Sequence, residues 1–525
     1  MNSFPWQLSK NKPWSPKGRN GWQKLWKIPL ALGFGLAGVL SILFATSQGA
    51  GLSSDSAAYI SAARSLLSSG TFMVPHDGKL VPLLLWPPLF PAISAAPGLI
   101  GIDPLTSVRW VNALFFGANI ILIGAIAGQM SRAPYLGFLL AALLILTSTE
   151  MYESHAMAWS EPAFIFLAFS GLAALAFYLE TNRSLFLLLA AACIGLAVIT
   201  RYVGVALLLV APISLSVLSR KSLRTRLLEA SFFAVVAVSP IAFWLARSYL
   251  GASSVFGRRL EVHPIALETI SDGLKSISSW FLPPDLTNAT SGGLVLTAIL
   301  CLGALAWWRI VRHHRTHEGS REPRWLFPIL CIFIGSYFLI LVLSISFLDP
   351  PTTLENRYLV PIYIALVVIL VSSTLAPLPK TISTLSLCFL VMLTWIHLNR
   401  APRWLAQNHA SGRGYSSKEW RASRLIQRVK SLPSEAAIFS NGSDAIYLLA
   451  NRISRDIPLN PLTAADIAEL DAPLNRGDAY LVYFTRLTQW RDYFPRLEDL
   501  KKRLDLRVDL DAPDGQVLVG TLRVP

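Results

Sequence analysis

The sequence predicts an all-α polytopic membrane protein with about 11 transmembrane helices and a small C-terminal α/β domain. Of its 525 residues, 53% are hydrophobic and only 15% are charged, whereas a soluble domain usually carries about 25% charged residues. Many apolar runs approach the roughly 20 residues that cross a bilayer as a helix. Beyond residue 398, short β-like runs alternate with turn formers such as Asn441-Gly442 and Asp514-Gly515. The low content of charged residues and the long apolar runs exclude a water-soluble globular enzyme and a disulfide scaffold.

Each apolar run has the length and polarity of a spanning helix. The two runs on either side of Thr200 could instead form one kinked unit. The expected spans cover residues 28–46, 107–129, 134–150, 158–179, 185–200, 202–218, 228–247, 291–308, 326–348, 358–375 and 381–398.

The basic residues predict how these helices are oriented. With the N-terminus inside, the inner segments carry 18 Lys or Arg and 4 Glu. The outer segments before residue 399 carry 9 Lys or Arg and 12 Asp or Glu. Because an excess of Lys and Arg marks the cytoplasmic face, the pattern predicts a cytoplasmic N-terminus and an extracytoplasmic C-terminus. The protein is then an integral, multi-pass protein of the inner or plasma membrane, and its net charge of +15 does not indicate a nucleic-acid partner.

The polar segments divide the chain into three expected domains. Residues 1–27 are basic and rich in Trp, which is typical of a cytoplasmic interfacial anchor. Residues 28–398 hold the helices, with two long outer loops at 47–106 and 248–290. Residues 399–525 are expected to form an extracytoplasmic α/β domain. Linking two helices needs only a few residues, so the long outer segments are where function is expected.

The first outer loop offers one carboxylate close to the membrane, Asp55. If the chain is helical from Ser56 onward, Tyr59 shares the face of Asp55. Lys79 follows, and then Trp86-Pro87-Pro88-Leu89-Phe90-Pro91, whose prolines favour a fixed, bent segment. On chemistry alone, Asp55 could simply be an acid that stabilises the start of a helix.

Further candidates lie in other loops on the same side. An ionised carboxylate at the start of a span is costly and usually has a partner or a role, although an acid before Pro162 is also a common helix start, and an arginine near the end of a span can be an anchor. Acids and arginines converging on one membrane face still favour a site. The candidates are Glu150, Glu153, His155, Glu161, Arg201, Tyr202, Glu355, Arg357 and Tyr358.

In their order, these features resemble the GT-C superfamily of polytopic glycosyltransferases, near the protein O-mannosyltransferases and the lipid A aminoarabinose transferases. The resemblance covers roughly residues 28–400. It rests on Asp55 with Tyr59 and Gly70, the Trp-Pro-Pro-Leu-Phe-Pro stretch, Ser160-Glu161, Thr200-Arg201-Tyr202 and Glu355-Asn356-Arg357-Tyr358-Leu359-Val360-Pro361.

The resemblance implies transfer of a sugar, with inversion, from a polyprenyl-phosphate-linked donor at the extracytoplasmic face. The acceptor would be a lipid, a glycan or a protein. Asp55 would be the general base and Glu161 the second catalytic carboxylate. Arg201, Arg357 and Lys79 would hold the phosphate, and Glu153, with help from His155, is an alternative for orienting the acceptor. Several GT-C branches have two adjacent acids in the first loop, whereas serines flank Asp55 here, so a role for a divalent metal ion stays open.

Two other functions are compatible with a polytopic chain. A transporter or flippase for a lipid-linked saccharide would need charged residues in mid-span and internal symmetry. A non-catalytic assembly subunit would use residues 399–525 to bind a partner. The spans show few central charges and no repeat, which favours the transferase.

Overall fold

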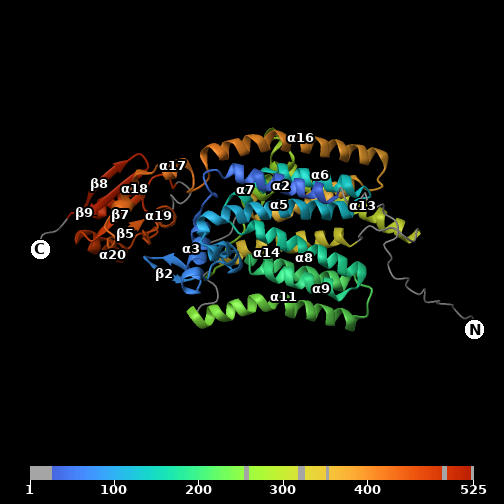
Figure 1. Ribbon diagram of the computed structural model, residues 1–525, viewed down its shortest axis with the longest axis horizontal. Helices are drawn as coiled ribbons and strands as arrows, with labels where there is room; N and C mark the ends of the chain where they lie inside the picture. Colours follow the sequence, from blue (N-terminus) through green and yellow to red (C-terminus); the bar gives the residue numbers. More distant parts are fainter. Residues whose placement is uncertain (1–26, 253–258, 317–324, 350–353, 488–492, 522–525) are drawn as a thin grey trace, which may run out of the picture.

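The structure is a computed structural model that describes residues 27–252, 259–316, 325–349, 354–487 and 493–521. The chain forms an elongated bundle of helices with a mixed α/β domain at one end (Figure 1). Residues 1–26, which hold almost all of the expected interfacial anchor, lie outside the described residues. We call the end of the bundle that carries the α/β domain the domain face.

Each of the 11 expected spans coincides with a helix. Eight of the described helices are long and apolar enough to cross a membrane, and a ninth span would combine α6 with α7, which are bent by 59°. The remaining two, α9 and α10, are shorter apolar helices. The bounds are α2 Lys27–Ala45, α5 Pro104–Met130, α6 Pro134–Thr147, α8 Glu161–Thr181, α9 Ser184–Val198, α10 Val205–Leu218, α11 Leu223–Ala252, α13 Ala289–Thr316, α14 Leu326–Phe347, α15 Asn356–Thr374 and α16 Lys380–Ser411.

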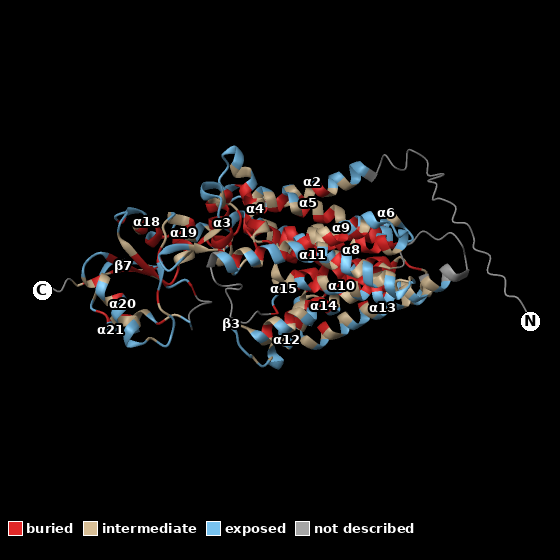
Figure 2. Ribbon diagram, turned by 90° about the horizontal axis from the view of Figure 1, so that it is seen from below, coloured by how far each residue is buried: buried red, intermediate tan, exposed pale blue. Residues whose placement is uncertain are grey.

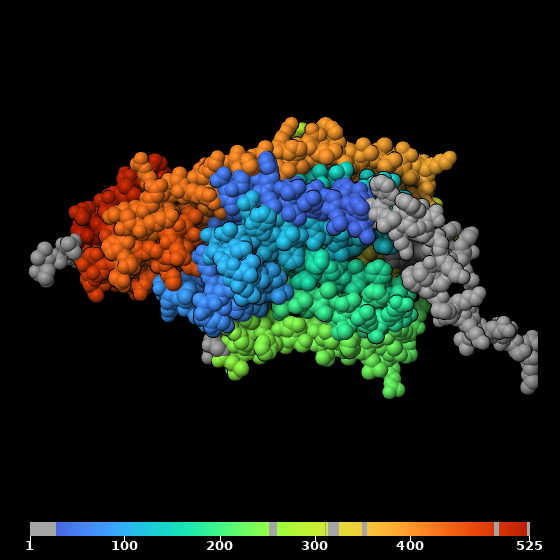
Figure 3. All heavy atoms as spheres, in the orientation of Figure 1, coloured from blue at the N-terminus to red at the C-terminus, as the bar shows by residue number. Residues whose placement is uncertain are grey.

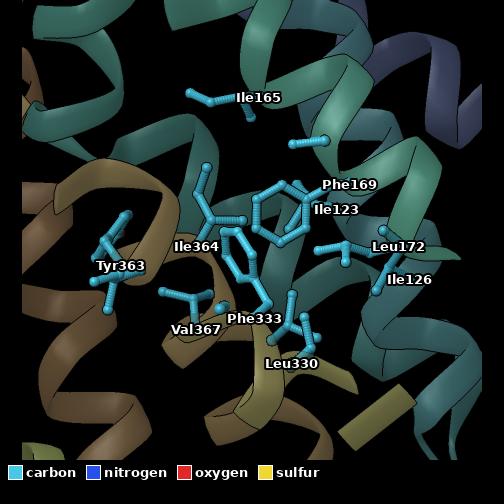
Figure 4. Packing of buried hydrophobic residues seen from close by; sticks show 14 of the residues in the cluster. Ile123, Ile126, Ile165, Phe169, Leu172, Leu330, Phe333, Tyr363, Ile364 and Val367 are labelled. Carbon is cyan, nitrogen blue, oxygen red and sulfur yellow. The ribbon is translucent and has the colours of Figure 1, made fainter. Parts of the chain in front are cut away.

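The centre of the bundle is packed with large apolar side chains. Phe169 of α8 and Phe333 of α14 lie with ring centroids 5.8 Å apart, surrounded by residues of α5 and α15 (Figure 4). Helix α15 is the most enclosed span, and every residue from Leu359 to Thr374 is buried. The peripheral helices α2, α11 and α13 instead turn exposed faces outward (Figure 2). Exposed apolar faces on long helices are what a bilayer requires, so the chain is an integral, multi-pass membrane protein.

Small residues let α2 and α5 approach closely. A Cβ added at Gly117 of α5 would lie 2.6 Å from the backbone oxygen of Gly35 in α2. Helix interfaces in membranes favour such small residues because backbone contact replaces the hydrophobic effect as the source of association. Contact between α2 and α5 places the end of α2, and with it the start of the first long loop, beside the N-terminus of α5.

Shorter elements cover the domain face. They comprise the interfacial helix α3, a hairpin, a second short helix, the bent end of the α6–α7 pair and an amphipathic helix α12. Their bounds are α3 Ser54–Ser69, β1 Met73–His76, β2 Lys79–Pro82, α4 Leu89–Ala95, η1 Ala96–Ile100, α7 Thr149–Ala156, η2 Tyr202–Gly204, β3 Arg259–Leu260, α12 Leu267–Phe281, η3 Pro284–Leu286 and β4 Leu348–Asp349.

The C-terminal domain is built on a five-stranded sheet with the order β6-β5-β7-β9-β8. Strands β5, β6 and β7 pair in parallel, β9 pairs antiparallel with β7, and β8 pairs antiparallel with β9 at the edge of the sheet. Helix α16 runs to Ser411, past the boundary expected at residue 398. The remaining bounds are α17 Lys418–Arg421, α18 Arg424–Ser431, β5 Ala437–Ser440, α19 Ser443–Ala450, β6 Arg455–Asp456, α20 Ala464–Asn475, β7 Ala479–Phe484, α21 Leu497–Arg503, β8 Leu506–Ala512 and β9 Gly515–Gly520.

Several contacts dock this domain on the first long loop. The amide of Tyr415 donates to the carbonyl of Leu52 at 3.0 Å, and the amide of Gly78 in the hairpin turn donates to the carbonyl of Ser454 at 3.2 Å. Arg64 of α3 donates to the side chain of Asn451 at 3.3 Å. Buried apolar residues of α3, α18 and α19 belong to one core cluster. The domain therefore packs directly against the helix that carries Asp55.

Candidate active site at the domain face

Asp55 lies in the first turn of α3. Ser53 caps this helix, and its side chain and that of Ser56 form a capping box. A carboxylate in the first turn also interacts favourably with the helix dipole. The helix start therefore fixes where Asp55 sits, close behind the end of α2, and leaves 27% of its side chain exposed.

Two partners hold the carboxylate of Asp55. The Trp86 indole donates to Oδ1 at 3.0 Å, and Nη2 of Arg357 lies 2.5 Å from Oδ2. Burial alone would raise the pKa of Asp55, but the charge of Arg357 and the indole hydrogen bond hold the pKa below its ordinary value. Asp55 is therefore an ionised carboxylate at neutral pH, as a group that accepts a proton must be.

Glu161 is the second carboxylate of the cluster. Its Oε1 lies 2.6 Å from Nη1 of Arg201 and also accepts a hydrogen bond from Nε of Arg357. Only 3% of the Glu161 side chain is exposed, and its buried Oε2 has no hydrogen-bond partner among the described residues. Arg357 thus bridges two acids that are 106 positions apart in the sequence.

The ends of three helical segments bring these side chains together. Glu161 begins α8 directly before Pro162, which is favoured in the first turn of a helix. Arg201 lies between the end of α9 and the short helix η2. Arg357 lies in the first turn of α15. Each side chain of this cluster therefore lies where a helix starts or ends at the domain face.

Aromatic side chains enclose the two arginines. The guanidinium of Arg357 lies 3.9 Å from the ring centroid of Trp159, and that of Arg201 lies 5.8 Å from the ring of Tyr358. Tyr59 and Ser160 share a hydrogen bond of 3.0 Å, and Nη1 of Arg201 donates to the same Ser160 at 3.3 Å. Burial, with the neighbouring charge of Asp55, raises the pKa of Tyr59. The rings limit the entry of water and strengthen the charge interactions.

Other candidates lie outside this cluster. Lys79 is exposed in the hairpin, and Glu355 is exposed at the N-cap of α15. Glu153 pairs with Arg413 of the C-terminal segment, while the buried carboxylate of Glu150 accepts from Ser148 at 3.0 Å and from Thr149. Of the three acids in this loop, only Glu161 lies with Asp55.

Two further candidates make structural contacts. His155 is buried beside Phe116, with its ring nitrogens 3.0 Å from Nδ2 of Asn119 and 2.7 Å from the carbonyl of Met151. Tyr202 donates to the carbonyl of Leu84 at 3.1 Å and accepts from the indole of Trp244. Tyr202 therefore anchors the segment that precedes Trp86 and lies beside the site.

Sequence reasoning did not single out Trp86, Trp159 or Asp444 as site residues. Asp444 of α19 lies against Ser54 and close to Asp55; burial, with the nearby charges of Asp456 and Asp55, raises its pKa to about 6 although the Ser54 hydroxyl opposes the shift. The two Trp residues carry a signal, since each sits in a stretch that holds other candidates. Asp444 carries none, because nothing local relates α19 to a loop almost 400 residues earlier.

The composition of the site bears on which ligand it can hold. In the described parts of the chain, no group of three or more His, Cys, Asp or Glu side chains is arranged to hold a metal ion. Asp55 and Glu161 are both neutralised by arginine rather than left facing each other. The cluster therefore has the composition of a site for an anion and a hydroxyl, with two cations, two carboxylates and aromatic walls.

The helical bundle with its docked C-terminal domain has the fold of solved polytopic membrane proteins of the GT-C type. ArnT from Cupriavidus metallidurans, solved bound to undecaprenyl phosphate, superimposes with a TM-score of 0.59 at 13% identity, over 96% of this chain and 98% of that chain. The archaeal oligosaccharyltransferase AglB from Archaeoglobus fulgidus, in complex with an inhibitory peptide and a dolichol-phosphate, gives 0.51 at 11% identity, over 89% and 70%. The sequence matches no family model and no curated protein.

Proposed function

We propose that the chain is a membrane glycosyltransferase that moves a sugar from a polyprenyl-phosphate-linked donor to an acceptor hydroxyl at the domain face. The observation that carries the proposal is the bridge made by Arg357 between Asp55 and Glu161, with Arg201 beside it. The shared fold with ArnT and AglB adds support, because both were solved with a polyprenyl or dolichol phosphate.

The proposed reaction is a single displacement. Asp55 takes the proton of the acceptor hydroxyl while the acceptor oxygen forms a bond to C1 of the sugar. The bond from C1 to the donor phosphate oxygen breaks, and the polyprenyl phosphate leaves with the electron pair. Attack on one face of C1 and departure from the other give inversion.

The arginines are suited to hold the leaving group. In the described structure Arg201 and Arg357 are neutralised by Glu161 and Asp55, so the cluster has no net charge. A phosphate that approaches Nη1 of Arg357 would weaken the hold of this arginine on Asp55 and so make the carboxylate a better base. Glu161, which is the more deeply buried acid, keeps both guanidinium groups in place and acts through them.

The orientation is part of the proposal. The excess of Lys and Arg in the segments at the opposite end of the bundle supports a cytoplasmic N-terminus, which makes the domain face extracytoplasmic. A polyprenyl-phosphate donor needs only cations at the level of the lipid headgroup and no nucleotide-binding fold. The proposed acceptor is a lipid, a glycan or a protein that reaches this face.

The test is a transfer assay with membranes that contain the full-length chain. Labelled sugars on undecaprenyl phosphate, supplied as a panel of hexoses and pentoses, are offered together with cell-envelope lipids and proteins. We expect Asp55→Asn to lower transfer at least a hundredfold, because general-base catalysis contributes about 10²–10⁴-fold.

The matched control is Asp77→Asn. Asp77 is exposed in the hairpin turn of the same loop and has a φ of 45°, which asparagine also adopts readily. This variant should keep the transfer rate of the original chain. Transfer by Asp55→Asn at the rate of the control, at equal expression, would contradict the assignment of Asp55 as the base.

A further inference from the structure

A pocket lined by apolar side chains and two arginines lies away from the ionic cluster, where the bundle meets the C-terminal domain. It has a volume of about 270 Å³, which is enough for a small headgroup. In Figure 3 the orange and red C-terminal domain abuts the blue N-terminal elements in this part of the molecule. Its walls come from the end of the α2–α3 loop, the start of α5 and the C-terminal domain, and they include Gly49, Leu105, Arg109, Trp110, Arg421 and Leu449.

The two arginines of this pocket are held by carbonyl and hydroxyl oxygens rather than by acids. Arg109 donates from Nε to Thr46 at 3.0 Å and from Nη2 to the carbonyl of Leu43 at 2.6 Å. Arg421 donates from Nη2 to the carbonyl of Gln48. Among the described residues, no carboxylate forms an ion pair with either arginine, and neither Nη1 has a hydrogen-bond partner. Two arginines thus line one pocket without an ion-paired carboxylate among the described residues, in contrast to Arg201 and Arg357.

Exposed apolar residues place the pocket at the boundary of the bilayer. Trp110 is 52% exposed, and Leu114, one turn further along α5, is 62% exposed. Leu99 and Ile100 of η1, shortly before α5 begins, are 82% and 80% exposed. Tryptophan is enriched at the level of lipid headgroups, and the exposed aliphatic residues near it in the sequence favour contact with acyl chains. A lipid whose tails lie along Trp110 and Leu114 has its headgroup beside Arg109.

We infer that this pocket binds the phosphate headgroup of an anionic membrane lipid, through Nη1 of Arg109 and Nη1 of Arg421. Arginine is well suited to phosphate because several N–H groups point in one plane. The bound phosphate would supply the missing negative charge and connect α5 to α17 of the C-terminal domain. The pocket shares no lining residue with the Asp55 cluster, so the inference does not depend on the proposed transfer reaction.

The test is native mass spectrometry of the purified full-length chain in detergent. Three probes are titrated: phosphatidylglycerol, diacylglycerol with the same acyl chains, and inorganic phosphate. We expect phosphatidylglycerol to be retained and diacylglycerol to be lost, because the phosphate carries the interaction. We expect Arg421→Gln and Arg109→Gln each to weaken phosphatidylglycerol binding about tenfold, in line with the loss of one charge-assisted hydrogen bond.

The matched control is Arg424→Gln, since Arg424 is exposed one turn beyond Arg421 and does not line the pocket. Arg421 is itself exposed, so its variant should fold even if Arg109→Gln does not. Equal retention of phosphatidylglycerol by Arg421→Gln and by the control would overturn the inference. So would equal retention of diacylglycerol, or binding of inorganic phosphate as tight as that of the lipid, which would indicate a site for a free anion.

Discussion

Replacing Glu161 with glutamine would test how the ionic cluster is balanced. The side chains of Glu161, Arg201 and Arg357 are 3%, 11% and 15% exposed, so water screens them weakly. A close pair of charges attracts by about 4 kcal/mol at an effective dielectric constant of 20, and Glu161 makes two such pairs. The amide oxygen of glutamine still accepts hydrogen bonds, so the substitution removes mainly the negative charge. Removing one partner from a buried pair costs about 3–5 kcal/mol of the free energy of unfolding, and we expect a loss of this size.

The double variant Glu161→Gln/Arg201→Gln tests whether charge imbalance causes the loss of stability. It removes one charge of each sign, so that Arg357 and Asp55 remain as a balanced pair. We expect it to be more stable than Glu161→Gln alone by about 1 kcal/mol or more, because residues in one ionic network are not additive.

Unfolding by denaturing detergent in mixed micelles would measure Glu161→Gln, Arg201→Gln and the double variant, with Glu268→Gln as the control. Glu268 is exposed at the start of α12, and its change should shift stability by no more than about 0.5 kcal/mol. A double variant whose loss equals the sum of the two single losses would refute the account of a shared network.

Trp86 and Asp444 are the two other side chains whose replacement should shift a measurable pH dependence. Trp86→Phe removes the indole hydrogen bond that lowers the pKa of Asp55; since a base must be ionised, the acidic limb of the pH profile of kcat/KM should move to higher pH, and an unchanged limb would speak against Asp55 as the base. Asp444 has a pKa raised to about 6 by burial, so the folded state binds its proton more tightly than the unfolded state and stability should fall as the pH rises from about 4 to about 6. Asp444→Asn should therefore raise Tm above pH 6 and have little effect on Tm near pH 4, and a Tm difference that is equal at both pH values would contradict this.

The span positions could be predicted because a bilayer demands one property, apolarity over a fixed length, that a sequence displays directly. The bend between α6 and α7 could not be predicted. The apolar α6 and the more polar α7 match the expected polarity of a span and the loop after it, and the bend changes only the direction of the backbone. The end of α16 could not be predicted either. The helix continues to Ser411 although the segment from Asn399 onward is largely polar, so the end of the apolar run did not mark the end of the helix.

The site was partly predictable for a similar reason. Asp55, Glu161, Arg201 and Arg357 are charged residues at the ends of apolar runs, where their cost makes them conspicuous. The sequence favoured Glu161 as the second carboxylate but left Glu150 and Glu153 open, because all three acids lie at or near the ends of expected spans on the same side. The distinction comes from long-range partners: Arg413 takes Glu153, while two arginines surround Glu161.

The length of α16 has a mechanical consequence. At 1.5 Å per residue, its 32 residues extend for about 48 Å, whereas the hydrocarbon layer is about 30 Å thick. The surplus continues beyond the apolar run to Ser411, where the C-terminal domain begins, so a change in the tilt of this helix would move the point from which that domain extends. A thinner or thicker bilayer alters that tilt, and the surroundings of the first interfacial helix would therefore respond to the lipid environment of the host membrane.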